Sequence, residues 1–233
     1  MTVLEEIALR QSILYGGIAL ALAFSLLYAA GFCYRGPSWP KTLVKAVPLL
    51  TLAAAAQINF ANPVVVSALA LSALGDIALS RDGDRAFLAG LVAFALAHLA
   101  YVLHFSGLLF GEDATRLLDV PLWPAALLIL FGLSSEIWLA PYTGALRWPV
   151  RIYVLLITLM GLSALSLPDA RGLAVIGAFA FIASDTLLAL HLFRLSAQSR
   201  WRVPVSVLLW LLYVAAQCLI LFGAGFARPL FHI

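Results

Sequence analysis

Eight long apolar runs, separated by short polar breaks, constrain the fold of this chain more than any other feature. A helix needs about 20 mostly apolar residues to cross a bilayer, and a backbone exposed to lipid must satisfy its hydrogen bonds internally. Runs of this length therefore predict transmembrane helices. We expect them at about 11–33, 42–60, 63–80, 86–110, 120–139, 149–167, 171–193 and 203–225.

The composition agrees with this interpretation. Hydrophobic residues make up 64% of the chain and charged residues 11%, whereas soluble proteins have roughly 45–50% and 25%. The breaks are too short to hold a separate domain, and Glu5 and Glu6 before the first run do not fit a cleavable signal peptide. The predicted fold class is all-α: a polytopic membrane protein, with residues 1–233 forming a single integral membrane domain of eight transmembrane helices.

The basic residues fall mainly on one side of the predicted bundle. The positive-inside rule places that side in the cytoplasm and both termini on the non-cytoplasmic side. Because the net charge of +3 comes from helix ends, we expect no nucleic-acid partner. The excess of Arg over Lys in an Ala- and Leu-rich chain favours a bacterial inner (plasma) membrane. The majority set holds ten of the 14 basic residues: Arg35, Lys41, Lys45, Arg81, Arg85, Arg147, Arg151, Arg194, Arg200 and Arg202.

Two carboxylates interrupt otherwise apolar runs. Asp76 lies within 67–80 and Asp185 within 177–190. A charged group in mid-bilayer costs about 2.5–3.5 kcal/mol even on lenient insertion scales, so such groups face a bundle interior or a polar cavity and mark a functional site. At the α-helical rise, the two aspartates lie about 7 and 13 Å inside the predicted cytoplasmic boundary. The sequence therefore predicts a shared site in the cytoplasmic half of the bundle.

Other polar residues near that depth have a structural as well as a functional interpretation. Lys45 is either a lysine that extends to the interface or a cation that pairs with an aspartate or a lipid phosphate. Tyr153 is either an interfacial tyrosine or part of the cavity. The charged loop at 81–85 is expected to be solvated.

Two further groups lie deeper in the predicted helices. His98 and Tyr101 share one helical face with several phenylalanines, and a lone buried histidine is more often a hydrogen-bonded structural group than a catalyst. Tyr213 and Gln217 are neighbours at i and i+4. Such a polar pair often holds transmembrane helices together.

The ordered set of these residues resembles the YhhN family of membrane proteins, whose characterised members are lysoplasmalogenases. The resemblance runs from the second predicted helix through the eighth. It rests on Lys45-x-x-Pro48, Ser72-x-x-Gly75-Asp76, Phe87-x-x-Gly90, His98-x-x-Tyr101, Tyr153, Ser184-Asp185 and Tyr213-x-x-x-Gln217.

The resemblance implies an ether hydrolase that cleaves the vinyl-ether bond of a lysoplasmalogen to a fatty aldehyde and glycerophosphoethanolamine or glycerophosphocholine. It implies a lysophospholipid substrate, membrane lipids as surroundings, and no cofactor or metal. Asp76 and Asp185 would be catalytic. The substrate-binding set would be Lys45, His98, Tyr101, Tyr153, Ser184, Tyr213 and Gln217.

Two buried carboxylates suit this chemistry. Acid cleaves a vinyl ether by protonating the outer alkenyl carbon, after which water adds to the oxocarbenium ion and the hemiacetal collapses. One carboxyl group can act as general acid while the other, ionised, stabilises the cation. Because coupled carboxyl groups titrate as a unit, the sequence does not assign the proton to either aspartate. Lys45 and nearby arginines could bind the head-group phosphate.

Three other classes also use buried acids. A proton-coupled transporter is the main alternative, because buried acids relay protons in such proteins. An intramembrane aspartyl protease would need Gly-x-Gly-Asp, but Ala73 stands three positions before Asp76. A metal-dependent hydrolase would need several histidines near the acids. Cys33 and Cys218 lie in separate apolar runs and are expected to be small buried hydrophobes rather than a disulfide or metal pair.

Overall fold

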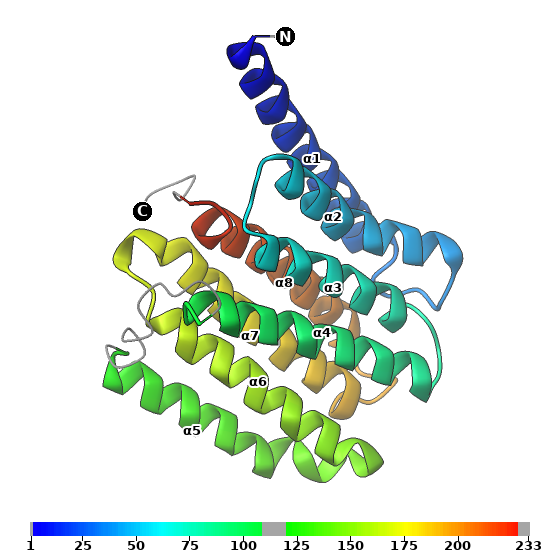
Figure 1. Cartoon of the computed structure of the whole chain (residues 1–233). Coiled ribbons are helices and arrows are strands. Elements are labelled where there is room, and N and C mark those ends of the chain that lie inside the picture. Colours follow the sequence, from blue (N-terminus) through cyan, green and yellow to red (C-terminus); the bar gives the residue numbers. More distant parts are fainter. Residues whose placement is uncertain (1, 109–119, 228–233) are drawn as a thin grey trace.

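The computed structural model describes residues 2–108 and 120–227, and in these ranges the chain is a bundle of eight α-helices (Figure 1). Seven are long and apolar enough to cross a membrane, and α3, with 17 residues, is the short one. The all-α polytopic membrane fold is therefore confirmed. The helices are α1 (Val3–Gly31), α2 (Trp39–Ile58), α3 (Pro63–Leu79), α4 (Asp84–Phe105), α5 (Leu122–Trp138), α6 (Arg147–Leu165), α7 (Gly172–Phe193) and α8 (Arg202–Ala224).

The predicted boundaries fail most at the first helix. We expected it to begin at about residue 11, but α1 begins at Val3 because Thr2 and Glu5 form a reciprocal capping box. Glu6 and Arg10 add an ion pair one turn apart, at 2.7 Å. Polar residues that do not belong in lipid therefore still continue the helix, and its first turns project beyond the bundle (Figure 1).

Two other ends differ for identifiable local reasons. Ser38 caps α2 by accepting a hydrogen bond from the Lys41 backbone, so that helix begins at Trp39 rather than at 42. The predicted helix 86–110 ends early, at Phe105, and Gly107 follows with a φ of 69°. A glycine in the left-handed region is a common helix stop. Residues 109 and 110 of that prediction lie outside the described ranges.

Helix α8 is the central element of the bundle. It packs against α7 along most of its length and also contacts α1, α2 and α3. On the other side, α6 contacts α4, α5 and α7, and α5 is the outermost helix (Figure 1). This arrangement brings α2, α3, α4, α6, α7 and α8 around one interior region.

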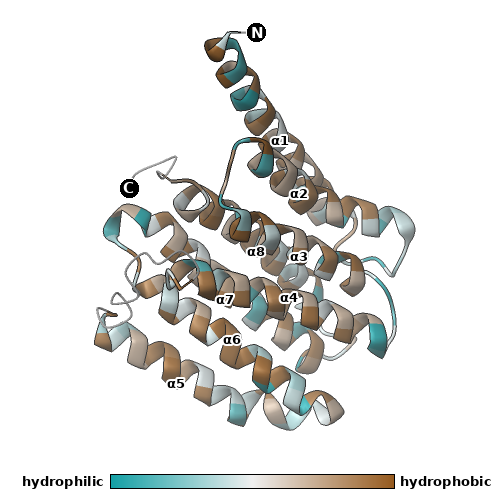
Figure 2. Cartoon of the chain, viewed as in Figure 1, coloured by the Kyte–Doolittle hydropathy of each residue, from teal (hydrophilic) through white to brown (hydrophobic). Residues whose placement is uncertain are grey.

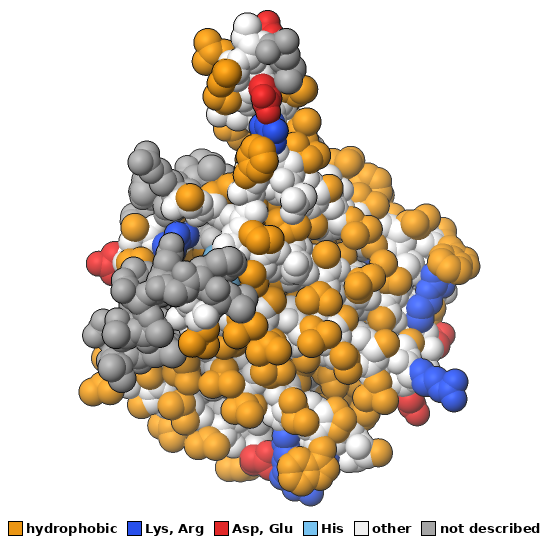
Figure 3. Space-filling view, viewed as in Figure 1, with side chains coloured by type: hydrophobic (Ala, Val, Ile, Leu, Met, Phe, Trp, Pro, Cys, Tyr) orange, Lys and Arg blue, Asp and Glu red, His pale blue; other side chains and the backbone are white. Residues whose placement is uncertain are grey.

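The surface matches a protein that lies in lipid. Hydrophobic residues cover the helices (Figure 2), and the space-filling view shows them across the visible face with charged side chains at its margins (Figure 3). The α1–α2, α3–α4, α5–α6 and α7–α8 connections all lie at one end of the bundle (Figure 1). Because this end carries the ten basic residues named above, we call it the basic end. Thr2 and the end of α8 lie at the opposite end.

Candidate active site

Asp76 lies on α3 in a nearly closed environment, with its side chain 2% exposed. The Lys45 Nζ from α2 is 3.0 Å from its Oδ1. The Tyr213 hydroxyl from α8 donates a hydrogen bond of 2.7 Å to its Oδ2. The lysine, with 13% of its side chain exposed, is therefore a counter-ion for this aspartate rather than a side chain that extends to the interface.

Small residues on α3 and α4 allow these helices to meet beside Asp76. A Cβ added at Gly75 would lie 2.6 Å from the Phe94 ring. One added at Gly90 would lie 2.7 Å from Leu79 and 3.4 Å from the Gly75 carbonyl oxygen. Glycine at both positions therefore places the Phe94 ring directly against the carboxylate-bearing turn.

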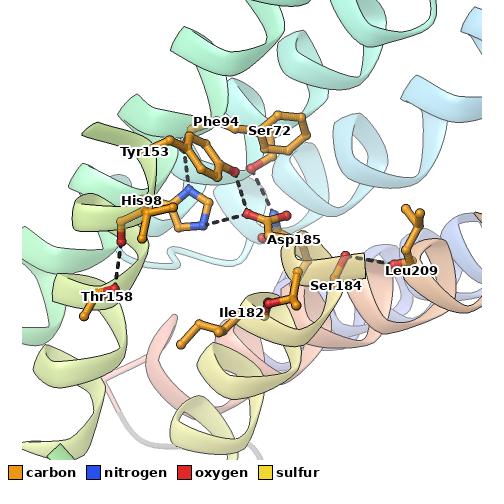
Figure 4. A network of polar contacts seen from close by, with 12 residues as sticks. Ser72, Phe94, His98, Tyr153, Thr158, Ile182, Ser184, Asp185 and Leu209 are labelled. Atoms are coloured by element: carbon orange, nitrogen blue, oxygen red, sulfur yellow. Dashed lines mark hydrogen bonds and ion pairs between the residues drawn. The ribbon is translucent and has the colours of Figure 1, made fainter. Parts of the chain in front are cut away.

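Asp185 lies on α7 with a different set of partners (Figure 4). The Tyr153 hydroxyl from α6 donates a hydrogen bond of 2.5 Å to its Oδ2. The His98 Nε2 from α4 lies 3.6 Å from the same oxygen. No lysine or arginine pairs with Asp185 in the part of the chain that the structure describes.

A cluster of aromatic rings connects the surroundings of the two carboxylates. Tyr213 makes edge contacts with Phe94 and Phe181, at ring-centroid distances of 5.7 and 5.5 Å. His98 contacts Phe181 at 4.6 Å and Tyr153 at 5.2 Å. Tyr213, which bonds to Asp76, and Tyr153 and His98, which face Asp185, therefore belong to one cluster of aromatic rings. Sequence reasoning did not include Phe181, although the aromatic pair Phe179 and Phe181 precedes Asp185 by a few residues.

A second polar layer lies behind this cluster. The Tyr101 hydroxyl donates to the Gln217 Oε1 at 2.5 Å, and the Gln217 Nε2 donates to the Ser72 Oγ at 2.9 Å. Tyr101, His98 and Gln217 are fully buried and line neither of the cavities described below. The Gln217 side chain accepts from Tyr101 on α4 and donates to Ser72 on α3, so these hydrogen bonds link α3, α4 and α8. Gln217 thus has the helix-linking role of the structural interpretation.

The two aspartates open onto one polar cavity of about 440 Å³. Lys45, Ser184 and Tyr213 also line it. The Ser184 hydroxyl donates to the Leu209 backbone oxygen at 2.9 Å, so it also joins α7 to α8. Toward the basic end the wall becomes charged, with Lys41, Arg81, Asp82, Asp84 and His191.

The charged loop between α3 and α4 is only partly solvated. The guanidinium of Arg81 stacks over the Trp39 ring, 3.7 Å from its centroid, and Arg81 lines the polar cavity. The prediction of a solvated loop is therefore wrong for Arg81. Sequence reasoning also missed Tyr28 and Trp210, which pack together at 4.3 Å and form part of the cavity wall.

A second, apolar cavity of about 90 Å³ shares part of its wall with the first. The shared lining residues are Leu79, Phe87, Phe94, Asp185, Leu188 and Leu192. The apolar cavity lies between α4, α5, α6 and α7, and Tyr153 lies in its wall. Its lining includes Phe131 and Leu192, which are 43% and 44% exposed on the outer surface. Asp185 is the ionisable residue of this shared wall and so lies at the junction of the polar cavity and the apolar, lipid-facing chamber.

Comparison with known proteins identifies the family. The profile of the YhhN family matches residues 40–224, which include α2 almost completely and all of α3 to α8. The chain belongs to the YhhN family. It is 31% identical over 209 residues to lysoplasmalogenase TMEM86A of Bos taurus, covering 82% of this chain and 81% of the relative.

Relatives from other organisms have similar names. A lysoplasmalogenase of Mycobacterium bovis is 31% identical over 189 residues, covering 78% of this chain and 68% of that protein. Lysoplasmalogenase TMEM86B of Sus scrofa is 34% identical over 166 residues, covering 67% and 65%. No solved structure matches the chain. The matched span of the YhhN profile contains both aspartates and every candidate substrate-binding residue.

Proposed function

We propose that this protein is a lysoplasmalogenase-type hydrolase that cleaves the vinyl-ether bond of a lysoplasmalogen. The products are a fatty aldehyde and glycerophosphoethanolamine or glycerophosphocholine. The observation that carries the proposal is the position of the two aspartates on one cavity, one beside a lysine and the other at the junction with an apolar chamber. An amphiphilic substrate whose reactive bond joins a polar head to an alkenyl chain matches that junction.

The two carboxyl groups have different roles in this proposal. Lys45 and the Tyr213 hydroxyl favour the ionised form of Asp76, because an ammonium and a donated hydrogen bond both stabilise negative charge. Asp185 has no such cation and lies beside the apolar chamber, whose lining would contact the part of the alkenyl chain next to the reacting bond. Asp185 is therefore the general acid, and Asp76 stabilises the developing cation.

The reaction follows from these positions. The Asp185 carboxyl group transfers its proton to the outer alkenyl carbon, and the inner carbon becomes an oxocarbenium centre. The negative charge of Asp76, whose side chain is 2% exposed, stabilises this cation. A water oxygen then bonds to the inner carbon and releases one proton. The resulting hemiacetal loses its C–O bond to glycerol, and aldehyde and alcohol leave.

The charged end of the polar cavity would hold the head group. The sequence suggests Lys45 and nearby arginines as ligands of the phosphate, but Lys45 pairs with Asp76. Lys41 and Arg81 lie nearer the mouth and are the better phosphate ligands. Asp82 and Asp84 line the same mouth and would attract the head-group ammonium.

A lipid panel tests the proposal. Purified protein would be incubated with matched lysolipids that carry a vinyl-ether, an alkyl-ether or an acyl chain, and the products would be identified by mass spectrometry. We expect aldehyde only from the vinyl ether, because only that linkage gives an oxocarbenium ion on protonation. Release of fatty acid from the acyl lipid, or proton-driven solute flux in liposomes without any hydrolysis, would replace this function by an esterase or a transporter.

A further inference from the structure

The hydrogen bond between His98 and its own helix fixes which ring nitrogen carries a proton. The His98 Nδ1 lies 2.6 Å from the Phe94 backbone oxygen (Figure 4). A carbonyl oxygen can only accept, so Nδ1 must be the donor. Protonation of Nε2 therefore decides whether this imidazole is neutral or charged.

The Nε2 atom faces Asp185 without a hydrogen-bond partner among the described residues. His98 is 0% exposed, so bulk water does not reach it. The 3.6 Å to the Asp185 Oδ2 is too long for a formed hydrogen bond. If neither group held a proton there, two lone pairs would face each other in a buried site, and that arrangement is costly.

We propose that Asp185 and His98 share a single acidic proton between Oδ2 and Nε2, and that His98 reloads Asp185 in each catalytic cycle. This inference rests on the proposed hydrolase function. Either location of the proton leaves the pair with no net charge: a neutral carboxyl group beside a neutral imidazole, or a carboxylate beside an imidazolium. A small movement of either side chain closes the gap to hydrogen-bonding distance.

The shared proton accounts for both halves of the reaction. After Asp185 has protonated the alkenyl carbon, the pair has lost its shared proton, and the Asp185 carboxylate faces the Nε2 lone pair of neutral His98. The mutual repulsion of these groups favours uptake of the proton that water releases as its oxygen bonds to the oxocarbenium carbon. During collapse of the hemiacetal, the pair accepts the hydroxyl proton and returns a proton to the departing glycerol oxygen. One water molecule is consumed and the pair is restored.

The groups around the pair are consistent with a single proton. Tyr153 on α6 donates to the Asp185 Oδ2 and so does not compete for Nε2. From α3, α2 and α8, the remaining polar groups are Asp76, Lys45 and Tyr213, which bond to one another. His98 is thus the imidazole in the described structure that faces this carboxyl group, and in our scheme it is a positioning and proton-holding residue.

Substitution of His98 tests the inference by two independent readouts. His98→Leu removes the lone pair, and His98→Gln offers an amide that can donate to an ionised Asp185. Both changes make loss of the acidic proton easier, so the alkaline limb of the activity profile should move to lower pH, with turnover lowered about tenfold or more. The matched control is His104→Gln on the same helix, whose ring nitrogen contacts the Ala224 backbone oxygen at 2.7 Å, away from both cavities.

Infrared spectroscopy supplies a readout that needs no substrate. The carbonyl-stretching band of a protonated carboxyl group should disappear in Asp185→Asn and should shift in both His98 variants, but not in His104→Gln. A wild-type alkaline limb together with an unshifted band in the His98 variants would overturn the shared proton. A wild-type protein that shows the band and its His98 dependence but hydrolyses no vinyl ether would instead contradict only the proposed function.

Discussion

At the scale of single residues, the two aspartates differ in their surroundings more than in their sequence contexts. Both follow a small residue in an apolar run, Gly75 or Ser184. In space, Asp76 has a lysine at 3.0 Å, whereas Asp185 has a tyrosine at 2.5 Å and an imidazole at 3.6 Å. This asymmetry is the basis of the different roles that we propose for the two carboxyl groups; the sequence alone offers no such basis.

The Asp76→Asn and Asp185→Asn variants test those roles. Asparagine keeps the shape of the side chain but neither carries the negative charge nor donates an acidic proton. We expect each variant to lose at least about 10²-fold in turnover, and the double variant to lose little more, because groups that act as a unit are strongly non-additive. Turnover would be measured with a vinyl-ether lysolipid and folding by thermal unfolding in detergent. Near-normal turnover in a folded single variant would show that the aspartates are structural.

Lys45 and Arg81 should affect different kinetic constants. Lys45→Met removes the counter-ion of a buried carboxylate, so we expect lower kcat and a loss of stability of about 3–5 kcal/mol. Arg81→Gln leaves that pair intact and removes a cation from the cavity mouth. We expect it to raise KM with little change in kcat, as loss of uniform substrate binding does. Steady-state kinetics of both variants separate the two cases, and a pure KM effect in Lys45→Met would restore that lysine as the phosphate ligand.

At the scale of elements, the tightest packing is between α7 and α8. A Cβ added at Gly223 would lie 2.3 Å from the Ala174 backbone nitrogen, and one at Gly177 would lie 2.9 Å from the Ala216 backbone oxygen. Small residues that let transmembrane helices approach closely are a common basis of their association. This contact holds Asp185 on α7 in register with Tyr213 on α8.

Two alanine substitutions, one at Gly223 on α8 and one at Gly16 on α1, test this packing. Gly223→Ala forces backbone apart, so we expect a loss of stability of about 1–3 kcal/mol, seen as a lower midpoint of thermal unfolding in detergent. Gly16→Ala is the control, because nothing lies within 4 Å of its added Cβ. Alanine is also the better helix former, so that variant should be neutral or more stable by up to about 1 kcal/mol. Equal midpoints for the two variants would contradict a close α7–α8 contact.

The sequence predicts the existence of the helices well because hydrophobicity and length determine them. It predicts their ends less well, since capping by Thr2 or Ser38 acts through local hydrogen bonds that hydropathy does not detect. A stop at Phe105 likewise depends on the backbone conformation of Gly107. The periodicity of α4 correctly placed Phe94, His98 and Tyr101 on one buried face.

At the scale of the whole molecule, the site forms because the topology brings together residues that are far apart in the sequence. Its polar groups come from α2, α3, α4, α6, α7 and α8, and the first and last of them are 168 positions apart, from Lys45 to Tyr213. The sequence could nominate these residues because polar groups are rare in apolar runs. It could not distinguish polar residues that line a cavity from buried polar residues that bond to each other outside the cavity, such as Tyr101 and Gln217. That distinction depends on helix rotation, which hydropathy does not determine.

The orientation of the molecule in the membrane is a further prediction at this scale. The α1–α2, α3–α4, α5–α6 and α7–α8 connections share the basic end, where the polar cavity has its charged mouth. The positive-inside rule places this end in the cytoplasm, and hence Thr2 and the end of α8 on the opposite side of a bacterial plasma membrane. The substrate head group would then enter the site from the cytoplasmic leaflet.

Reporter fusions in a bacterial host check this orientation. A reporter that is active only outside the cytoplasm should be active when fused after residue 227 and inactive when inserted in the α7–α8 connection, near Ser199. A reporter that is active only in the cytoplasm should give the opposite pattern. Because Arg194, Arg200 and Arg202 flank that connection, replacing all three by Gln should weaken the preference. Cytoplasmic activity of the C-terminal fusion in the unmodified protein would reverse the assigned orientation and would place the cavity mouth in the outer leaflet.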